Sequence, residues 1–331
     1  MVLASCLGVA CKRNAPPATQ GTQSSAPLQT VACSRQPIPS DSPAPDVHPD
    51  IPDGSDTSNS DKYITREFLR NVELTGEMLH VADADTDASR AVLALSARVD
   101  SASWVRHPED VPVSAARVVA VLNNWICATQ DLPPPRRAAG LLTADRLLNR
   151  AWAVARLWDS TAAGLRLELD KIGATSYRAP EGDDFYYRDA WLEDAAAVDP
   201  NSPAGQAARL LQIRHSCADQ GDLAEYDSLI ARAEALAATA LDPRVQREAN
   251  FIAADAYRDI VGLAFGASDG EVDSSLYLPR AKAARTRAIT HYAAALKADT
   301  TSWMAVEALV DYHRLKQGEQ PSGLRLFCRG D

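Results

Sequence analysis

The stretch from Asp199 to Pro243 constrains the fold more than any other, because it encloses two amphipathic helical patterns between two Asp-Pro pairs. In each half apolar residues recur at spacings of three and four, the period of one helix face. Ser202 followed by Pro203 is a typical helix start, since the serine oxygen can cap an orphan amide and proline fits the first helical position. Asp222, with Glu225 three residues later, predicts the start of the second helix. We therefore expect a helical hairpin.

The same period recurs along most of the chain from Tyr63 onward, and no stretch predicts a β-strand. Helical patterns cover about 64–82, 88–99, 113–129, 144–165, 185–200, 203–218, 222–240, 243–265, 280–298 and 302–316. The pattern at 144–165 predicts a helix of about six turns. Gly266 is expected to end the helix at 243–265. The sequence thus predicts an all-α fold, either helical hairpins stacked as an α-solenoid or an irregular helical bundle.

The first sixty residues differ in composition from the rest. Between Lys12 and Ser60 there is no aromatic residue, and nine of the chain's twenty prolines lie there. Such a segment cannot bury enough apolar surface to offset its ordering entropy, so residues 12–62 are expected to form a flexible tether. The expected domains after it are an N-terminal helical bundle at 63–172 and a second helical region at 173–331.

The net charge of −10, from 44 acidic and 34 basic residues, argues against nucleic acid as a partner. No apolar run has the eighteen or more residues of a membrane-spanning helix. Six cysteines are too few for a dense disulfide framework. Cys127 and Cys217 lie in helical patterns, where a free cysteine is normally a small buried hydrophobe, and Cys33 and Cys328 lie near the ends of the chain. The sequence leaves the disulfide state of all four open.

Leu3-Ala4-Ser5-Cys6 resembles the lipobox of bacterial lipoproteins, and Cys11 ends a second, poorer match. The resemblance implies that Cys6 is lipidated after signal cleavage, with residues 1–11 as the remnant of the signal and the tether holding the folded part away from the membrane. A signal peptide also needs a basic region and an apolar stretch before its cleavage site, so further residues are expected upstream of Met1. The alternative is an ordinary N-terminus on a cytoplasmic protein.

Two segments resemble the tetratricopeptide repeat. Its second helix is matched by Ala288, Tyr292, Ala295 and Leu296, and the small and aromatic positions of its first helix by Ala253, Ala254 and Tyr257. The resemblance covers roughly 190–315 and implies a right-handed stack of helix pairs with a concave binding face. The period departs from the family's roughly 34 residues, since Pro200 and Pro243 are 43 residues apart.

Aromatic and acidic residues concentrate just before the hairpin at 199–243. They are Tyr177, Asp183, Asp184, Phe185, Tyr186, Tyr187 and Trp191. Amphipathic aromatics beside carboxylates can stack a sugar ring or anchor a peptide, which makes these seven residues the candidate ligand site. The alternative is that the aromatics fill the junction between the two helical regions.

No motif indicates catalysis, a metal or a cofactor. Asp83, Asp85 and Asp87 have the spacing that opens a calcium loop, but Ala88 and Ala94 replace its glycine and its last glutamate. An acidic turn that caps the next helix is therefore expected. The chain contains no nucleophile elbow, no glycine-rich phosphate loop and no His-Glu-x-x-His.

These observations predict an exported, lipid-anchored helical scaffold that binds a protein or peptide at the cell envelope and contacts the membrane through its anchor alone. One alternative is a solute- or glycan-binding subunit of a transport system that uses the aromatic residues. Another is an all-α enzyme with Asp183 and Asp184 as its acids. The sequence leaves the oligomeric state open.

Overall fold

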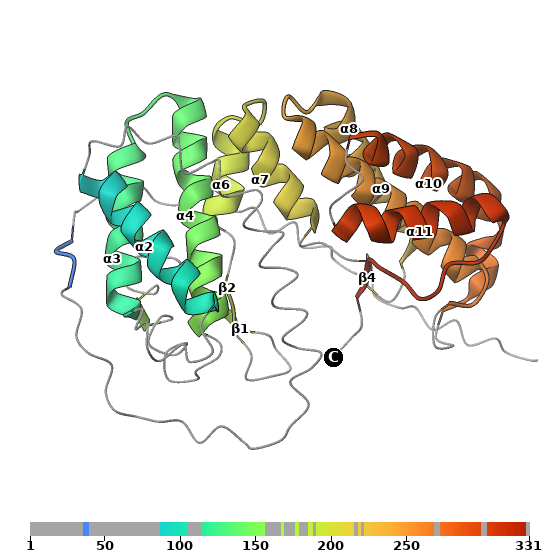
Figure 1. Ribbon diagram of the computed structural model, residues 1–331, viewed down its shortest axis with the longest axis horizontal. Coiled ribbons are helices and arrows are strands. Elements are labelled where there is room, and N and C mark those ends of the chain that lie inside the picture. The colour runs from blue at the N-terminus through green and yellow to red at the C-terminus, as the bar shows by residue number, and fades with distance from the viewer. Residues whose placement is uncertain are drawn as a thin grey trace, which may run out of the picture. The chain divides into compact units, whose positions relative to one another are not determined.

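The computed structural model describes residues 36–39, 87–104, 114–155, 167–168, 176–178, 185–187, 190–214, 218–219, 222–267, 272–298 and 303–328. The fold of these residues is all-α, as expected (Figure 1). The α-helices are α2 (Asp87–Trp104), α3 (Ala115–Thr129), α4 (Pro134–Ala155), α6 (Ala190–Val198), α7 (Pro203–Arg214), α8 (Leu223–Thr239), α9 (Pro243–Ala264), α10 (Leu278–Ala298) and α11 (Trp303–Gln317). A short 3₁₀ helix, η3 (Ser274–Leu276), precedes α10.

Two short strand pairs, which the sequence did not predict, add to the helices. Strand β1 (Ser176–Arg178) pairs antiparallel with β2 (Phe185–Tyr187), and β3 (Ala218–Asp219) pairs parallel with β4 (Phe327–Cys328). The helix expected from residue 185 begins only at Ala190. The aromatic run of β2 consists of residues that favour strands, and this preference prevails over the helical period there.

The predicted signals at the helix ends in and near the hairpin at 199–243 are confirmed. The Oγ atom of Ser202 accepts a hydrogen bond from the Gly205 amide at 3.2 Å, in the first turn of α7. The Asp222 carboxylate caps α8 by accepting a bond from the Ala224 amide at 2.8 Å. Gly266 ends α9 with a φ of 77°, a left-handed conformation that glycine adopts at little cost.

Replacing Gly205 by alanine is expected to destabilise the protein by about 1–3 kcal/mol, because the new Cβ would overpack the turn before α7. That Cβ would lie 1.8 Å from the carbonyl oxygen of Asp199, a backbone atom that cannot rotate away. At an uncrowded helical position the same change would stabilise the protein by roughly 0.8–1 kcal/mol. The sign of the change in stability therefore shows whether Gly205 is crowded. Urea denaturation measures it, and an increase in the free energy of unfolding would contradict the close approach.

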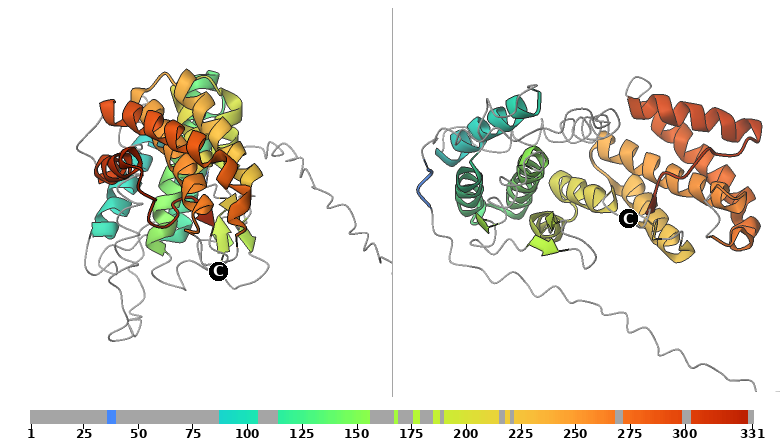
Figure 2. Two further views of the ribbon diagram at one scale, coloured as in Figure 1. Left: turned by 90° about the vertical axis from the view of Figure 1, so that its right-hand side faces the viewer. Right: turned by 90° about the horizontal axis from the view of Figure 1, so that it is seen from below.

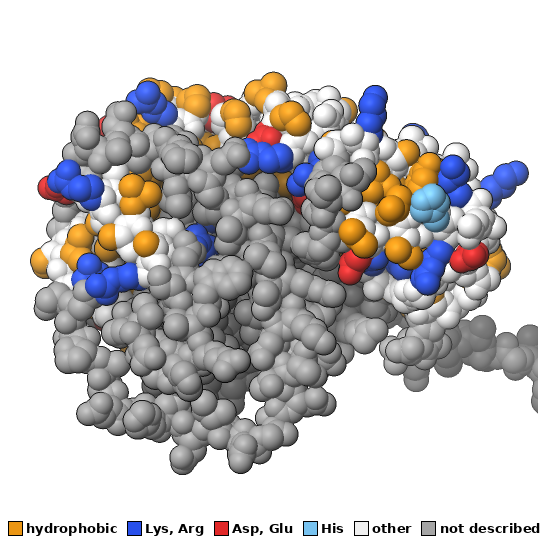
Figure 3. Space-filling view, in the orientation of Figure 1, with side chains coloured by type: hydrophobic (Ala, Val, Ile, Leu, Met, Phe, Trp, Pro, Cys, Tyr) orange, Lys and Arg blue, Asp and Glu red, His pale blue; other side chains and the backbone are white. Residues whose placement is uncertain are grey.

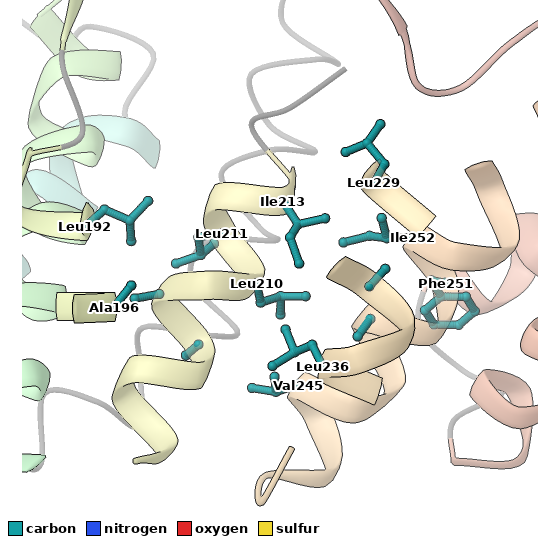
Figure 4. Packing of buried hydrophobic residues seen from close by; sticks show 14 of the residues in the cluster. Leu192, Ala196, Leu210, Leu211, Ile213, Leu229, Leu236, Val245, Phe251 and Ile252 are labelled. Carbon is teal, nitrogen blue, oxygen red and sulfur yellow. The ribbon is translucent and has the colours of Figure 1, made fainter. Parts of the chain in front are cut away.

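Successive helices pack against one another in chain order (Figure 2). Helix α7 joins the earlier and the later helices into one hydrophobic core (Figure 4). Its Leu211 points toward Leu192 of α6, whereas Leu210 and Ile213 point toward α8 and α9. Helix α9 packs against both α8 and α10 and is buried along most of its length. Helix α9 is therefore the centre of the α8–α10 layer, and α11 packs on α10.

Two further observations concern the cysteines and the apolar character of the helices. Cys127 in α3, whose disulfide state the sequence left open, is disulfide-bonded. Cys33 and Cys217 lie outside the described residues. In the described part of the chain, no helix combines the length and the apolar character needed to cross a bilayer.

Candidate functional site

The predicted lipidation sites Cys6 and Cys11 lie outside the described residues, as do Asp183 and Asp184. The remaining candidates lie on the β1–β2 pair and at the start of α6. Within the strand pair, Tyr177 is opposite Tyr186, Arg178 is opposite Phe185 and Ser176 is opposite Tyr187. The hairpin thus brings together four aromatic residues that are up to ten positions apart in the sequence, and their binding of a ligand stays a prediction.

Trp191 differs from the other candidates, because it is only 8% exposed and belongs to the hydrophobic core. Its neighbour Leu192, also on α6, is fully buried. A tryptophan in this position contributes its area to packing and offers no open face for a sugar ring. For Trp191 the structure thus favours the alternative in which the aromatic fills the junction.

A candidate binding surface that the sequence analysis did not identify lies on the last helix. Val306, Leu309 and Val310 are 54%, 40% and 48% exposed, and His313 one turn later is also exposed. Their spacing of i, i+3, i+4 and i+7 places all four on one stripe of α11, here called the α11 face. Figure 3 shows hydrophobic side chains gathered over this helix.

The opposite side of α11 is buried. Ala305 is fully buried, and Ala308 and Leu315 follow it along the same stripe into the core. The helix packs against α10 through this side. Because α11 is apolar on both sides, its outer stripe is not the solvated polar face that an amphipathic helix at a protein surface normally presents.

The segment that follows α11, residues 321–328, is here called the C-terminal strap. It runs back to α9, where the buried Arg258 guanidinium donates hydrogen bonds of 3.0 Å to the carbonyl oxygens of Ser322 and Gly323. The amide of Ala218 donates a hydrogen bond of 2.8 Å to the carbonyl oxygen of Leu326, next to the β3–β4 pair. The strap therefore ties the end of the chain to α9 and to the residues before α8.

Asp259 of α9 is the buried centre of these contacts. Its carboxylate accepts bonds from the backbone amides of Arg325, at 2.9 Å, and Leu326, at 2.7 Å. The Tyr226 hydroxyl of α8 donates a further bond at 3.3 Å, and an Arg258 nitrogen lies 3.1 Å away. Four groups from three parts of the chain thus surround one carboxylate. Its two charged oxygens have enough lone pairs to accept from all four.

A second set of charges joins the strap to α11 itself. The Arg325 guanidinium donates two bonds to Asp311, at 3.0 and 2.8 Å, and one to Glu307 at 2.7 Å. Asp311 also lies 2.8 Å from Nε of Arg258. On the far side, the Tyr292 hydroxyl of α10 donates a bond of 2.5 Å to Asp255, and these buried groups link α9, α10 and α11. The network fixes the orientation of α11, and with it the α11 face.

Asp259 is expected to make the stability of the folded protein depend on pH. Burial raises its pKa from the usual 3.8 to about 6, and the Leu326 amide and Arg258 only partly oppose this effect. Between these two values the folded protein holds a proton that the unfolded chain releases. The contribution of Asp259 to stability is therefore complete below about pH 4 and is lost as the pH rises to about 6.

Urea denaturation of the wild type and of Asp259→Asn, at a series of pH values, checks this. The stability of the wild type relative to the variant is expected to fall by about 1.4 kcal/mol per pH unit over the window between the two pKa values, and to level off above it. A relative stability that stayed constant or rose with pH across that window would contradict the raised pKa.

A third polar cluster lies across α8, α9 and α10, and it is partly exposed. Glu234 accepts a bond of 2.9 Å from the Tyr257 hydroxyl and lies 3.0 Å from Nε2 of His291. The other ring nitrogen of His291 lies 2.9 Å from Oδ1 of Asn250, and the ring stacks on Tyr257 with centroids 5.9 Å apart. Burial, followed by the bond to Glu234, raises the pKa of Tyr257 to about 12. The partners satisfy one another across three helices, an arrangement that holds the helices together.

Sequence signals existed for both the network and the α11 face. Arg258 and Asp259 interrupt the apolar pattern in the last third of α9, on a buried helix where charges are rare unless paired. The apolar residues of α11 occupy more than one face.

In the described ranges, no group of three or more histidine, cysteine, aspartate or glutamate side chains is arranged to hold a metal ion. Comparisons with protein-family models, with curated proteins and with solved structures found no match.

Proposed function

We propose that this chain is an exported helical scaffold that binds a protein partner at the cell envelope through the α11 face. The observation that carries the proposal is the row of three apolar side chains, 40–54% exposed, on a helix held from beneath by a buried ionic network. Such a stripe matches the i, i+3, i+4 anchors by which helices dock into apolar grooves or onto one another. A contiguous exposed apolar surface of this kind marks interaction sites, whereas apolar side chains scattered singly do not.

The position of α11 supports the same reading. In stacks of helix pairs each unit covers the apolar side of its neighbour. The outer side of α11 is apolar and exposed, so we assign that side to a partner. The buried small and aromatic positions of α9 and α10, among them Ala254, Ala288 and Tyr292, fit the proposed tetratricopeptide-like packing.

The proposed location is the outer side of a membrane, through a lipid on Cys6. The lipobox-like residues before Cys6 and the tether after it support this part of the proposal. The disulfide bond at Cys127 adds to it, because disulfides persist in oxidising compartments outside the cytoplasm.

Photo-cross-linking in the producing cells tests the binding surface. A benzophenone amino acid at Val306 is expected to give one discrete product with a second protein after irradiation. The matched control places the same group at Leu241, which is 66% exposed between α8 and α9 and lies on no apolar stripe. Equal labelling at both positions, no product at Val306, or a product containing only a second copy of this chain would each reject the proposal.

A further inference from the structure

The surface of α11 changes its chemistry along the helix. Its first half presents Val306, Leu309 and Val310, which are apolar and exposed. Its last turn carries Arg314 and Lys316 instead, and Lys316 is exposed. Because Lys316 comes seven residues after Leu309, it lies two turns further on the same side of the helix, about 10 Å along the axis. A row of apolar contacts therefore leads directly to a positive charge.

The Lys316 ammonium is held in a defined place. It lies 5.1 Å from the centre of the Tyr312 ring and donates a hydrogen bond of 3.4 Å to the Tyr312 hydroxyl. The Tyr312 ring in turn packs edge-on against His313, with centroids 5.4 Å apart. These contacts orient the ammonium but do not neutralise it. Among the described residues, no carboxylate forms an ion pair with Lys316.

Helix α10 adds two cations at the same end of α11. Gly318 follows the last turn of α11, and a guanidinium nitrogen of Arg285 lies 3.4 Å from the place that a Cβ on Gly318 would occupy. Lys282 precedes Arg285 by three residues, so both lie on one side of α10. Within the described part of the chain neither has an ion-pair partner. By contrast, Arg280 on the same helix pairs with Asp227 of α8.

The cations at this end of α11, here called the basic end, are Lys282, Arg285, Arg314 and Lys316. The acidic side chain next to them in the sequence is Glu319. Glu307, near the apolar half of α11, already accepts a bond from Arg325. The chain as a whole carries a net charge of −10, so a surface with four cations and one carboxylate differs sharply from the average. Figure 3 shows basic side chains beside the apolar ones over the last helices.

We propose that the segment of the partner that docks on the α11 face is an amphipathic helix with carboxylates in its first turn. This inference rests on the proposed function. The apolar residues of that helix would cover Val306, Leu309 and Val310, while its carboxylates lie at the basic end. Carboxylates in a first turn are also stabilised by the dipole of their own helix. The docked helix then runs antiparallel to α11, because opposite charges across an interface fix its direction.

An anionic membrane surface fits the same residues less well. A helix that binds a membrane surface is rich in lysine and arginine along its polar face, on both sides of the apolar stripe. On α11 the cations are confined to the last turn, and the residue directly after Val306 is the acidic Glu307. An arrangement with an apolar end and a basic end matches a ligand that is itself polarised along its length, such as a short helix.

Zero-length cross-linking of the full chain in the envelope of the producing cells tests this inference. A carbodiimide joins a lysine amine to a carboxylate that touches it, forming an amide and taking up the water released. We expect amides from Lys282 or Lys316 to the protein that the benzophenone at Val306 captures. In the partner peptide, the linked carboxylate should precede apolar residues at helical spacing. Lys297, exposed at the other end of α10, is the matched control.

Equal amide formation at Lys297, or a Val306 photoproduct without any amide at Lys282 and Lys316, would overturn the inference while the proposed function stands. Loss of the Val306 photoproduct itself would reject the proposed function, on which the inference rests. The two failures are thus distinguishable.

Neutral variants provide a second, independent measurement. Replacing Lys282, Arg285 and Lys316 together by glutamine is expected to lower the yield of the Val306 photoproduct about tenfold, because three exposed ion pairs with the partner are lost. The matched control replaces the exposed cations Arg232, Arg287 and Lys297 by glutamine, which gives the same net charge, and its yield is expected to equal that of the wild type. Equal yields in the two variants would contradict the inference. So would an unchanged yield combined with loss of binding to phosphatidylglycerol vesicles, since the basic end would then serve a membrane.

Discussion

Replacing Arg258 by methionine is expected to lower the free energy of unfolding by about 3–5 kcal/mol, the cost of removing one partner from a buried ion pair. The side chain is buried and lies within 3.1 Å of both Asp259 and Asp311. Its removal would leave two buried carboxylates without this cation and would release the two carbonyl oxygens of the C-terminal strap. Methionine keeps most of the volume, so loss of charge dominates the effect.

Arg280→Met is the matched control. Arg280 pairs with Asp227 on the surface, where the side chains are 37% and 51% exposed. Exposed pairs contribute about 0–1 kcal/mol, so this variant is expected to stay close to the wild type. Chemical denaturation of the three proteins at one pH measures the difference. Equal losses in the two variants would show that the Arg258 network does not hold the strap and α11 in place.

Replacing Leu309 by aspartate is expected to weaken binding of the cross-linked partner by at least about 2 kcal/mol, or roughly thirtyfold in Kd. The substitution places a charge in the middle of the α11 face, between Val306 and His313. Because Leu309 is 40% exposed and outside the buried stripe, the stability of the free protein is expected to change by no more than about 0.5 kcal/mol. Calorimetric titration of the purified partner into each protein measures the loss.

Leu241→Asp serves as the control for charge alone, since Leu241 is more exposed than Leu309 and lies away from α11. Its affinity for the partner is expected to equal that of the wild type. If both variants bound as tightly as the wild type, the α11 face would not be the docking surface. If Leu309→Asp unfolded the protein, Leu309→Ser would replace it in the same titration.

The parts of the fold that could be predicted from the sequence are those with local causes. The cap at Ser202, the cap at Asp222 and the glycine end at Gly266 each depend on atoms within a few residues, and the structure places each helix end where its signal lies. Helical period determined the all-α fold for the same reason. The strand at Phe185–Tyr187 was missed because a three-residue strand has no period to detect.

The candidate surface could not be derived in this way, because its causes are distant in the sequence. Asp259 meets the amides of Arg325 and Leu326 across more than sixty residues, and no local pattern announces that pairing. The exposure of Val306 depends on which side of α11 the strap and α10 cover. The helical pattern around Cys127 likewise carries no sign of its disulfide bond.

The central claim is that α11 is a rigid surface before any partner arrives, and hydrogen exchange measured along the full chain tests it most directly. Amides in the middle of α11 are expected to exchange as slowly as those of α10 in the free protein. With the cross-linked partner added, exchange in α11 should slow further, while exchange in α8 stays unchanged. Unprotected amides in free α11, or slowing confined to other helices on binding, would contradict the account.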